Sequence, residues 1–214
     1  MRYITFALAK GRLAREAMTL FGRMGVHCED MDENSRRLVF VDEENQFKFF
    51  LAKASDVPTY VEYGAADLGV AGKDTLMEEN RRLYEALDLR FGQCRMVVAG
   101  APALADKLSE NDLRIATKYP HIAADYFRKK KGRTVEIIRL NGSVELGPIV
   151  GLADFIVDIV ESGSTLKENG LAVLEEICGV SARLVVNRAS MKLEHERIAA
   201  LIERMRRVVA EDQV

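Results

Sequence analysis

Short apolar runs alternate with amphipathic segments along almost the whole chain, and this alternation limits the fold more than any other feature of the sequence. The runs at 3–9, 66–72 and 154–160 have the length and apolar character of buried strands. Residues 12–24 instead repeat apolar side chains every three or four positions and are followed by Gly25, a pattern typical of an amphipathic helix. Strands that alternate with helices predict an α/β fold built on mostly parallel sheets flanked by helices.

The remaining segments extend this pattern and indicate two lobes. Further strands are expected at 36–42, 46–53, 93–102, 112–117, 134–142 and 182–190. Further helices are expected at 55–64, 119–132, 143–152, 165–179 and 192–212. A crossover between lobes fits near 92–94 and again near 179–181. We therefore expect one lobe from residues 1–92 and 180–214, and a second lobe from residues 93–179.

The composition is that of an ordinary soluble protein. Of the 214 residues 48% are hydrophobic and 30% are charged, with a net charge of −2. This balance gives no basic field for nucleic acid or for an anionic membrane. Three isolated cysteines without a CxxC pair favour neither a zinc site nor a disulfide framework, and they fit a reducing compartment. The first apolar run is too short to span a membrane and lacks a cleavage signal, so we expect a cytoplasmic protein.

The segment that follows the run at 154–160 carries the strongest chemical signal. Ser162, Gly163, Ser164 and Thr165 lie where a strand is expected to end and a helix to begin. Ligands of parallel sheets bind at the carboxyl ends of strands, and backbone amides at a glycine-containing turn can bind an anion. Because three hydroxyls accompany these amides, the segment predicts a phosphate-binding turn.

Two acidic residues beside this turn extend the prediction to a phosphorylated sugar. Either Asp158 or Glu161 is placed to accept hydrogen bonds from neighbouring ribose hydroxyls. Thr165 and Glu168 also have the spacing of a capping box, so part of the pattern could serve only to begin a helix. A cap does not, however, require two serines around a glycine as well.

A second strand end carries two cations. Lys10 and Arg12 flank Gly11 directly after the first expected strand, where they can face a polyphosphate. Basic residues at the start of a helix are also common without any ligand. None of the three histidines lies in a Ser/His/Asp or Cys/His arrangement, so catalysis would rest on positioning and charge.

Two further strand ends are candidates for ligand contacts. Asp67, Gly72 and Lys73 belong to a glycine-rich segment that could bring a base or a phosphate close to the backbone, although tight packing would also explain its glycines. Thr117 ends an expected strand immediately before a helix. We predict that these four residues contact the substrate.

Taken together, these segments resemble the ATP phosphoribosyltransferase family. The matching stretches are ALAKGRL, SDVPTYVEYGAADLGVAGKD, ATKYP, LNGSVELGPIVGLADFIVDIVESGSTLKENGL and RLVVNRAS, in the family's order over nearly the whole chain. The departures are mild. Ser162 and Ser164 stand where the family often has threonine, Gly147 where it often has alanine, and Lys53 where it often has arginine.

The resemblance implies an enzyme that transfers the phosphoribosyl group of phosphoribosyl pyrophosphate to N1 of ATP and releases pyrophosphate, the first step of histidine biosynthesis. It implies two lobes of the type II periplasmic-binding-protein kind facing each other across a cleft. Residues 158–165 would bind phosphoribosyl pyrophosphate, Lys10 and Arg12 would be catalytic, and Mg²⁺ would be held by the substrates rather than by a protein metal site. The length fits the family's short form, which implies a homodimer within a hetero-oligomer and a regulatory subunit similar to histidyl-tRNA synthetase.

Two functions from other classes share parts of this pattern. A two-lobed ligand-binding or sensor domain could use the Ser162–Thr165 turn for another small anion, and a scaffold could merely support a catalytic partner. The expected cytoplasmic location disfavours an extracytoplasmic binder. Release of pyrophosphate from the two substrates would distinguish the enzyme from both.

Overall fold

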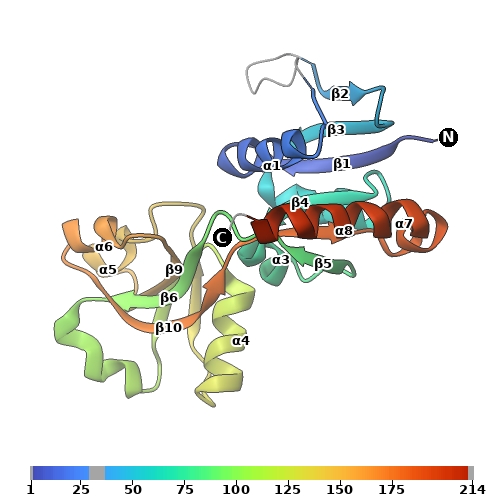
Figure 1. Cartoon of the computed structure of the whole chain (residues 1–214). Coiled ribbons are helices and arrows are strands. Elements are labelled where there is room, and N and C mark those ends of the chain that lie inside the picture. The colour runs from blue at the N-terminus through green and yellow to red at the C-terminus, as the bar shows by residue number, and fades with distance from the viewer. Residues whose placement is uncertain (1, 29–36, 212–214) are drawn as a thin grey trace. The chain divides into compact units, whose positions relative to one another are not determined.

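The computed structural model describes residues 2–28 and 37–211, and the chain folds into two compact units (Figure 1). Unit 1 is formed by Met1–Gly92 and Ser181–Val214, and unit 2 by Gln93–Val180. Each unit is built on one mixed sheet. The chain leaves unit 1 once and returns to it once, so unit 1 contains both the first and the last helix.

The sheet of unit 1 has the strand order β2-β3-β1-β4-β11-β5. Its strands are β1 (Ile4–Ala9), β2 (Val39–Asp42), β3 (Phe47–Ala52), β4 (Leu68–Gly72), β5 (Tyr84–Asp88) and β11 (Ala182–Val186). The neighbours β3, β1 and β4 are parallel, whereas β2, β11 and β5 pair antiparallel with their neighbours. The carboxyl ends of β3, β1 and β4 therefore meet at one edge of the sheet.

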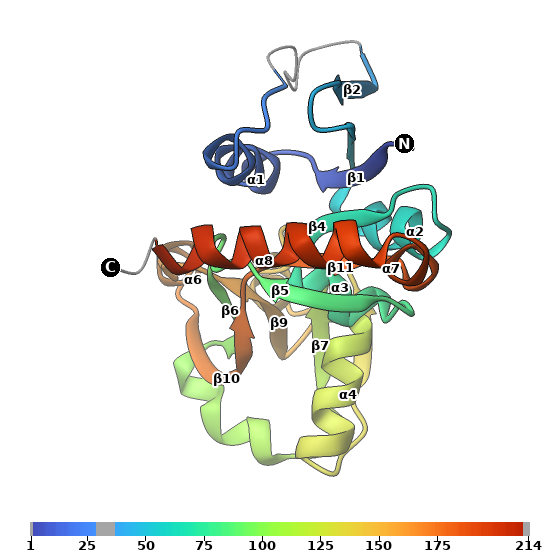
Figure 2. The same cartoon turned by 45° about the vertical axis from the view of Figure 1, so that its right-hand side comes forward.

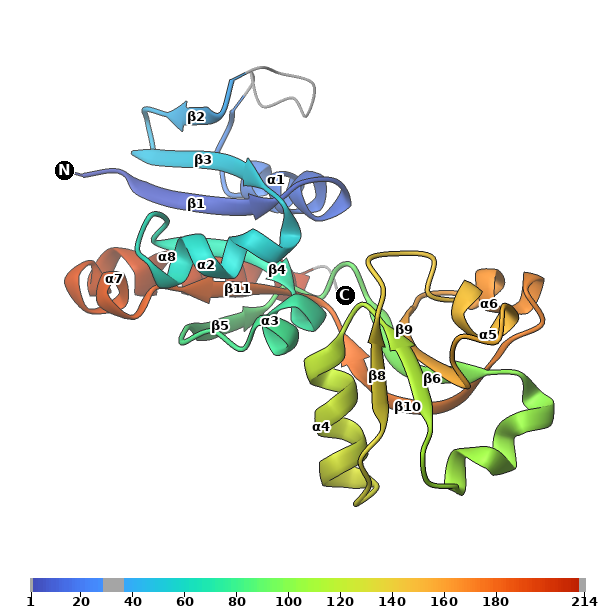
Figure 3. The ribbon, with the colours of Figure 1, turned by 180° about the vertical axis from the view of Figure 1, so that it is seen from behind.

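Helices cover both faces of this sheet (Figures 2 and 3). They are α1 (Arg12–Arg23), the 3₁₀ turn η1 (Ala54–Asp56), α2 (Val57–Glu62), α3 (Lys73–Glu79), α7 (Arg188–Leu193) and α8 (His195–Glu211). Alternate side chains of β1 divide between two cores, as the period of a strand requires. Phe6 and Leu8 pack in the core that includes residues of α1 and α8, and Ala7 and Ala9 pack with residues of α2.

The sheet of unit 2 has the strand order β10-β6-β9-β7-β8. Its strands are β6 (Cys94–Gly100), β7 (Arg114–Thr117), β8 (Glu136–Arg139), β9 (Phe155–Val160) and β10 (Ala172–Val180). Its helices are the 3₁₀ helix η2 (Pro102–Ser109), α4 (Pro120–Lys130), α5 (Leu146–Ile149) and α6 (Ser164–Glu168). Because β9, β7 and β8 are parallel, their carboxyl ends also meet at one edge.

A buried aspartate stands directly before β9, at the opposite, amino edge of this sheet. Asp154 is 8% exposed, accepts a hydrogen bond from the backbone N–H of Arg114 at 2.8 Å and forms an ion pair with Lys107 at 2.6 Å. Burial alone would raise the pKa of Asp154, but the Lys107 ammonium and the Arg114 N–H outweigh burial and lower the pKa below its usual value. The charged carboxylate therefore fixes the starts of β7 and β9 relative to each other.

One segment of unit 2 folds differently from the prediction. The predicted helix at 165–179 ends at Glu168, and Ala172–Val180 forms the strand β10. Leucine and glutamate favour a helix locally, but this segment pairs antiparallel with β6 from Ala172↔Gly100 to Val180↔Cys94. The tertiary pairing outweighs the local propensity.

The predicted terminal helix at 192–212 is divided into α7 and α8, which meet around Glu194. The first of these begins before the predicted start, because the buried side chain of Asn187 accepts hydrogen bonds from the N–H groups of Ala189 and Ser190 at 2.9 Å. This cap ends the strand segment at Val186 and begins a helix two residues later.

Candidate functional site

The turn between β9 and α6 has the backbone that the sequence indicated. Gly163 is the N-cap of α6 and has a φ of 80°, in the left-handed region that glycine adopts without strain. Its carbonyl accepts the Lys167 N–H at 3.1 Å, which closes the first helical turn. The first amides of a helix have no acceptor within it, so this turn presents N–H groups at the carboxyl end of β9.

The side chains of this turn are hydroxyls at the protein surface. Ser162, Ser164 and Thr165 are exposed, and the Oγ atoms of the two serines lie 3.1 Å apart. The Ser164 N–H also donates to Ser162 Oγ at 3.3 Å. The N-cap of α6 is Gly163 rather than Thr165, so the capping box that Thr165 and Glu168 could have formed is not made. The Ser164 and Thr165 hydroxyls are therefore not explained by a capping box.

Both acids that we predicted as ribose contacts lie beside this turn. Glu161 directly follows β9 and is exposed, whereas Asp158 is half-buried within the strand and accepts a hydrogen bond from the N–H of Ile159 at 2.8 Å. Glu161 is thus the more accessible of the two carboxylates.

Thr117 does not have the exposed hydroxyl that a substrate contact would need. It is fully buried, its Oγ1 donates to the carbonyl of Val157 at 2.6 Å, and it accepts the N–H of Tyr119 at 2.8 Å. The bond to Val157 holds the end of β7 against β9, and the bond from Tyr119 lies in the turn before α4. These bonds occupy the hydroxyl, and the substrate contact of Thr117 stays a prediction. Thr117 supports the edge on which the turn stands.

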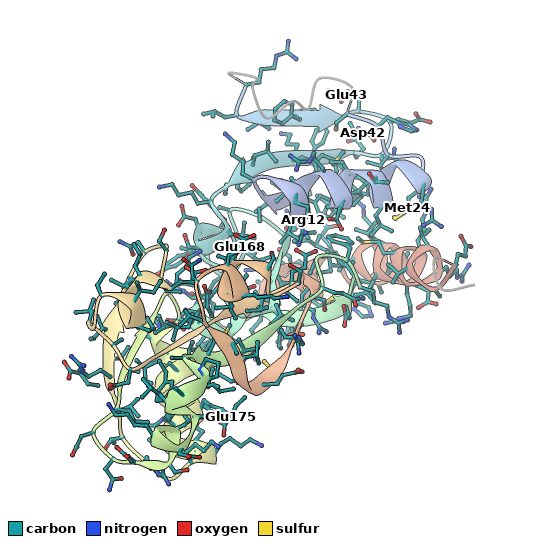
Figure 4. All side chains as sticks on the ribbon, turned by 90° about the vertical axis from the view of Figure 1, so that its left-hand side faces the viewer. Arg12, Met24, Asp42, Glu43, Glu168 and Glu175 are labelled. Carbon is teal, nitrogen blue, oxygen red and sulfur yellow. The ribbon has the colours of Figure 1, made fainter. Side chains whose placement is uncertain are left out.

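The carboxyl end of β1 places two cations at the edge of unit 1. Lys10 is exposed, Gly11 has φ 97° and ψ −146°, and Arg12 is the first residue of α1 (Figure 4). A residue with a side chain would be strained at these Gly11 dihedral angles, so a glycine is needed where the chain turns from β1 into α1. Arg12 Nε lies 3.6 Å from the Glu16 carboxylate, and the Arg12 side chain is 49% exposed.

A third cation at this edge, Lys53, is not among the predicted site residues. Because β3 and β1 are parallel with Ala52 opposite Ala9, Lys53 and Lys10 follow equivalent positions of neighbouring strands. The Lys10 N–H donates to the Ala52 carbonyl at 2.9 Å, and both lysines are exposed. The signal in the sequence was a lysine directly after an apolar run, but only the pairing of the strands brings the two lysines together.

The end of β4 completes this edge of unit 1. Gly72 is the N-cap of α3, and a Cβ atom there would lie 2.1 Å from Oδ1 of Asp74. Lys73 is the first residue of α3, and its ammonium forms an ion pair with Glu85 of β5. The Asp74 carboxylate thus lies close against Gly72, and the charge of Lys73 is compensated within the unit.

Asp67 does not belong to this edge. It precedes β4 at the amino end of the sheet, is 3% exposed, and accepts hydrogen bonds from Arg2 at 2.8 Å, Ser190 at 2.6 Å and the N–H of Thr5 at 2.9 Å. These contacts occupy the Asp67 carboxylate, and its substrate contact stays a prediction. Asp67 holds the start of β4 to β1 in the way that Asp154 does between the strands of unit 2.

Comparison with known proteins decides the family. The model of the family described as ATP phosphoribosyltransferase matches residues 53–207. An ATP phosphoribosyltransferase of Lachnoclostridium phytofermentans is 61% identical over the full length of both chains. The chain belongs to the ATP phosphoribosyltransferase family. Its activity is the transfer of a phosphoribosyl group to ATP, the first step of histidine biosynthesis. An ATP phosphoribosyltransferase of Ruminiclostridium cellulolyticum is 57% identical over 96% of this chain and 97% of its own.

Solved structures agree with the fold. A structure described as the ATP phosphoribosyl transferase (HisG:HisZ) complex from Thermotoga maritima has a TM-score of 0.80 and 35% identity, and covers 97% of this chain and 99% of its own. The VFT2 domain of Bordetella pertussis BvgS has a TM-score of 0.60 at 14% identity, covering 97% of this chain and 87% of its own. The predicted two-lobed fold of the periplasmic-binding-protein type is confirmed by these likenesses.

Members of this family use a divalent metal ion. In the part of the chain that the structure describes, no group of three His, Cys, Asp or Glu side chains could hold one. Beside the turn of unit 2, Asp158 and Glu161 carry carboxylate oxygens, a donor type that divalent cations such as Mg²⁺ prefer. Within residues 2–28 and 37–211, no helix is both long and apolar enough to cross a membrane.

Proposed function

We propose that the β9-α6 turn binds the 5-phosphate of phosphoribosyl pyrophosphate. The observation that carries this proposal is the left-handed Gly163 at the mouth of α6, with exposed hydroxyls on both sides of it. Amides and hydroxyls that converge on one point suit the three oxygens of a terminal phosphate. Glu161 or Asp158 then accepts hydrogen bonds from the ribose hydroxyls.

The cations of unit 1 have the complementary task. Lys10 and Arg12 contact the polyphosphate chains, and we add Lys53 because it follows the strand beside β1. Lys73, at the start of α3, offers its ammonium, which pairs with Glu85, as a further phosphate contact, and the Gly72 backbone lies at the same strand end. Arginine offers paired donors to phosphate oxygens, whereas a lysine acts as a point charge.

The chemistry requires placement more than proton transfer. N1 of the adenine ring attacks C1 of the ribose, the bond between C1 and the pyrophosphate oxygen breaks, and pyrophosphate leaves with inversion at C1. Positive charge develops on the sugar and negative charge on the leaving group. The ring nitrogen is already nucleophilic, so the residues of the chain orient the two substrates and stabilise the developing charge.

The metal of this reaction is Mg²⁺ in our proposal. Glu161 or Asp158 is the carboxylate that would complete its coordination, while the substrate phosphates supply most of its ligands. When bound, Mg²⁺ neutralises charge that builds on pyrophosphate. The hard oxygen donors of these side chains suit this ion, and its site would depend on the substrate rather than on a cage of protein ligands.

The partner of the chain follows from its relatives. The Thermotoga maritima structure is named as a complex of HisG with HisZ. We propose that this chain is likewise a short-form catalytic subunit, which works as a homodimer within a hetero-oligomer with a regulatory subunit similar to histidyl-tRNA synthetase. We also place the complex in the cytoplasm, where its nucleotide substrates are.

One assay tests this function against both alternatives. The purified chain, with and without the HisZ-like subunit, is mixed with ATP, phosphoribosyl pyrophosphate and MgCl₂, and pyrophosphate release is measured. We expect release that needs both substrates and that increases with the partner. Binding of either substrate without release by the complex would indicate a sensor domain, and neither binding nor release by the isolated chain would indicate a scaffold.

A further inference from the structure

Lys73 is held at the carboxyl edge of unit 1 by an acid from another strand. Its ammonium forms an ion pair with Glu85 of β5, and the two side chains are 30% and 34% exposed. Lys73 occupies the first position of α3, where the helix dipole disfavours a cation. A lysine side chain also has many rotamers, so the ammonium needs a counter-charge to stay in one place. Glu85 supplies that charge.

Glu85 is in turn fixed by an arginine. Arg183 of β11 lies beside β5 and reaches two of its acids, Glu85 at 3.4 Å and Asp88 at 3.1 Å. The Arg183 side chain is 21% exposed, and its Nε is buried without a hydrogen-bond partner among the described residues. The guanidinium therefore depends on these two carboxylates for its placement, and Glu85 cannot turn away without costing Arg183 one of its two acidic partners.

The same contacts return to the backbone of Lys73. Ser181 Oγ donates to the second oxygen of Asp88 at 2.8 Å, and the Ser181 carbonyl accepts the Lys73 N–H at 2.9 Å. The contacts thus form a closed ring from the Lys73 side chain through Glu85, Arg183, Asp88 and Ser181 to the Lys73 main chain. Both ends of this one residue are anchored by the ring.

The ring leaves the ammonium accessible. Lys73 and Glu85 both line a pocket of about 240 Å³ in unit 1. The other lining residues are Leu76, Met77, Asn80, Arg81, Leu83 and Val185. The pocket runs along α3 from its first residue to the segment after its last, so it leaves open space beside the Lys73–Glu85 pair.

We propose that Glu85 is a positioning residue for substrate binding, which acts by holding the Lys73 ammonium where it meets a substrate phosphate. This inference rests on the proposed function, in which Lys73 contributes a charge to the polyphosphate. Glu85 itself touches no substrate. Removal of the Glu85 carboxylate therefore weakens substrate binding in a chain that has Lys73, and has no further effect in a chain that lacks it.

The test is a double-mutant cycle of Glu85→Gln, Lys73→Met and the double variant, each assayed as the full chain with the regulatory subunit. We expect each single change to raise the KM for the polyphosphate substrate about 3- to 10-fold with little change in kcat. The double variant should be no worse than Lys73→Met alone, because the two residues act as one unit. Glu176→Gln is the matched control: this acid pairs with Arg95 at 3.2 Å on unit 2, and its loss should leave KM unchanged.

Three outcomes would overturn the inference. Additive increases in KM would mean that Glu85 acts without Lys73. A lower melting temperature for Glu85→Gln with an unchanged KM would mean that the ring is only structural. An unchanged KM for Lys73→Met would mean that this lysine meets no phosphate. Failure of the proposed function is visible separately, since the unmodified complex would then release no pyrophosphate.

Discussion

The two units have similar amino edges and different carboxyl edges. At the amino edge of each sheet a buried aspartate, Asp67 or Asp154, accepts the N–H of the neighbouring strand and pairs with a cation. At the carboxyl edge, unit 1 carries Lys10, Arg12 and Lys53, whereas unit 2 carries a glycine turn between serines. The shared feature belongs to the fold, and the feature that differs is the candidate for function.

The difference between the carboxyl edges is one of chemistry as well as composition. Hydrogen bonds from amides and hydroxyls depend on direction, so the turn of unit 2 can recognise the shape of one phosphate ester. Charges on long, exposed side chains act over a longer range and are screened by salt. We therefore expect unit 2 to be sensitive to backbone geometry, and unit 1 to be sensitive to charge and ionic strength.

The largest effect is expected from Gly163→Val. A β-branched residue cannot adopt a φ of 80° without strain, so the amides of the turn would no longer converge, and affinity for phosphoribosyl pyrophosphate should fall by about 100-fold or more. Calorimetry measures the affinity and circular dichroism checks the fold. Gly132→Val is the matched control, because Gly132 has a φ of 66° in the same unit with open space around it. Equal losses in both variants would show that strain alone, rather than the phosphate contact, is responsible.

The next effect is expected from Arg12→Ala. Loss of a positioned charge at the leaving group should lower kcat by about 100-fold, with a weaker dependence of activity on salt than in the unmodified chain. Arg23→Ala is the control, since Arg23 lies at the other end of α1 and pairs with Glu211 at 3.3 Å. If both arginine variants had the same kcat, the cations at the carboxyl edge of unit 1 would have no special role in catalysis.

The smallest effect on activity is expected from Asp154→Asn, at the edge where the units are alike. The change removes a charged hydrogen-bond acceptor and should lower the free energy of unfolding by about 1–3 kcal/mol, while substrate KM stays the same. Because the folded-state pKa of Asp154 lies below its usual value, its stabilisation is present at neutral pH and is lost as pH falls through that folded-state pKa.

Thermal melts across acid pH measure this loss. The melting temperatures of Asp154→Asn and of the unmodified chain should converge as the medium becomes more acidic. A gap that persisted after Asp154 had been protonated would assign the stabilisation to packing instead. A changed substrate KM in Asp154→Asn would show that the amino edge also affects substrate binding, contrary to the distinction drawn between the two edges.

Much of the fold could be predicted from the sequence, because most strands are short apolar runs and most helices are amphipathic. The strand β10 could not, since its Leu174 and Glu175 favour a helix and only β6 makes the segment a strand. The strand β5 was not predicted either. Its residues are partly exposed and show no long apolar run, and the strand that pairs with it, β11, lies about a hundred residues later in the sequence.

The site divides in the same way. The turn at Gly163 could be predicted because its chemistry is local, contained in a few consecutive residues. The burial of Asp67 and Thr117 could not be predicted, because in a sequence a polar residue at a strand end looks the same whether it faces solvent or bonds to the next strand. Lys10 and Lys53 lie side by side because of the register between β1 and β3, and this register cannot be read from the pattern of residues along the sequence.

The position of β11 in the sheet has a consequence for synthesis of the protein. This strand lies between β4 and β5 and is made only after all of unit 2. While the ribosome is still translating unit 2, β5 lacks the strand that pairs with it, and the sheet of unit 1 stays incomplete between β4 and β5. Unit 2, whose residues are continuous in the chain, can be complete before that gap is filled.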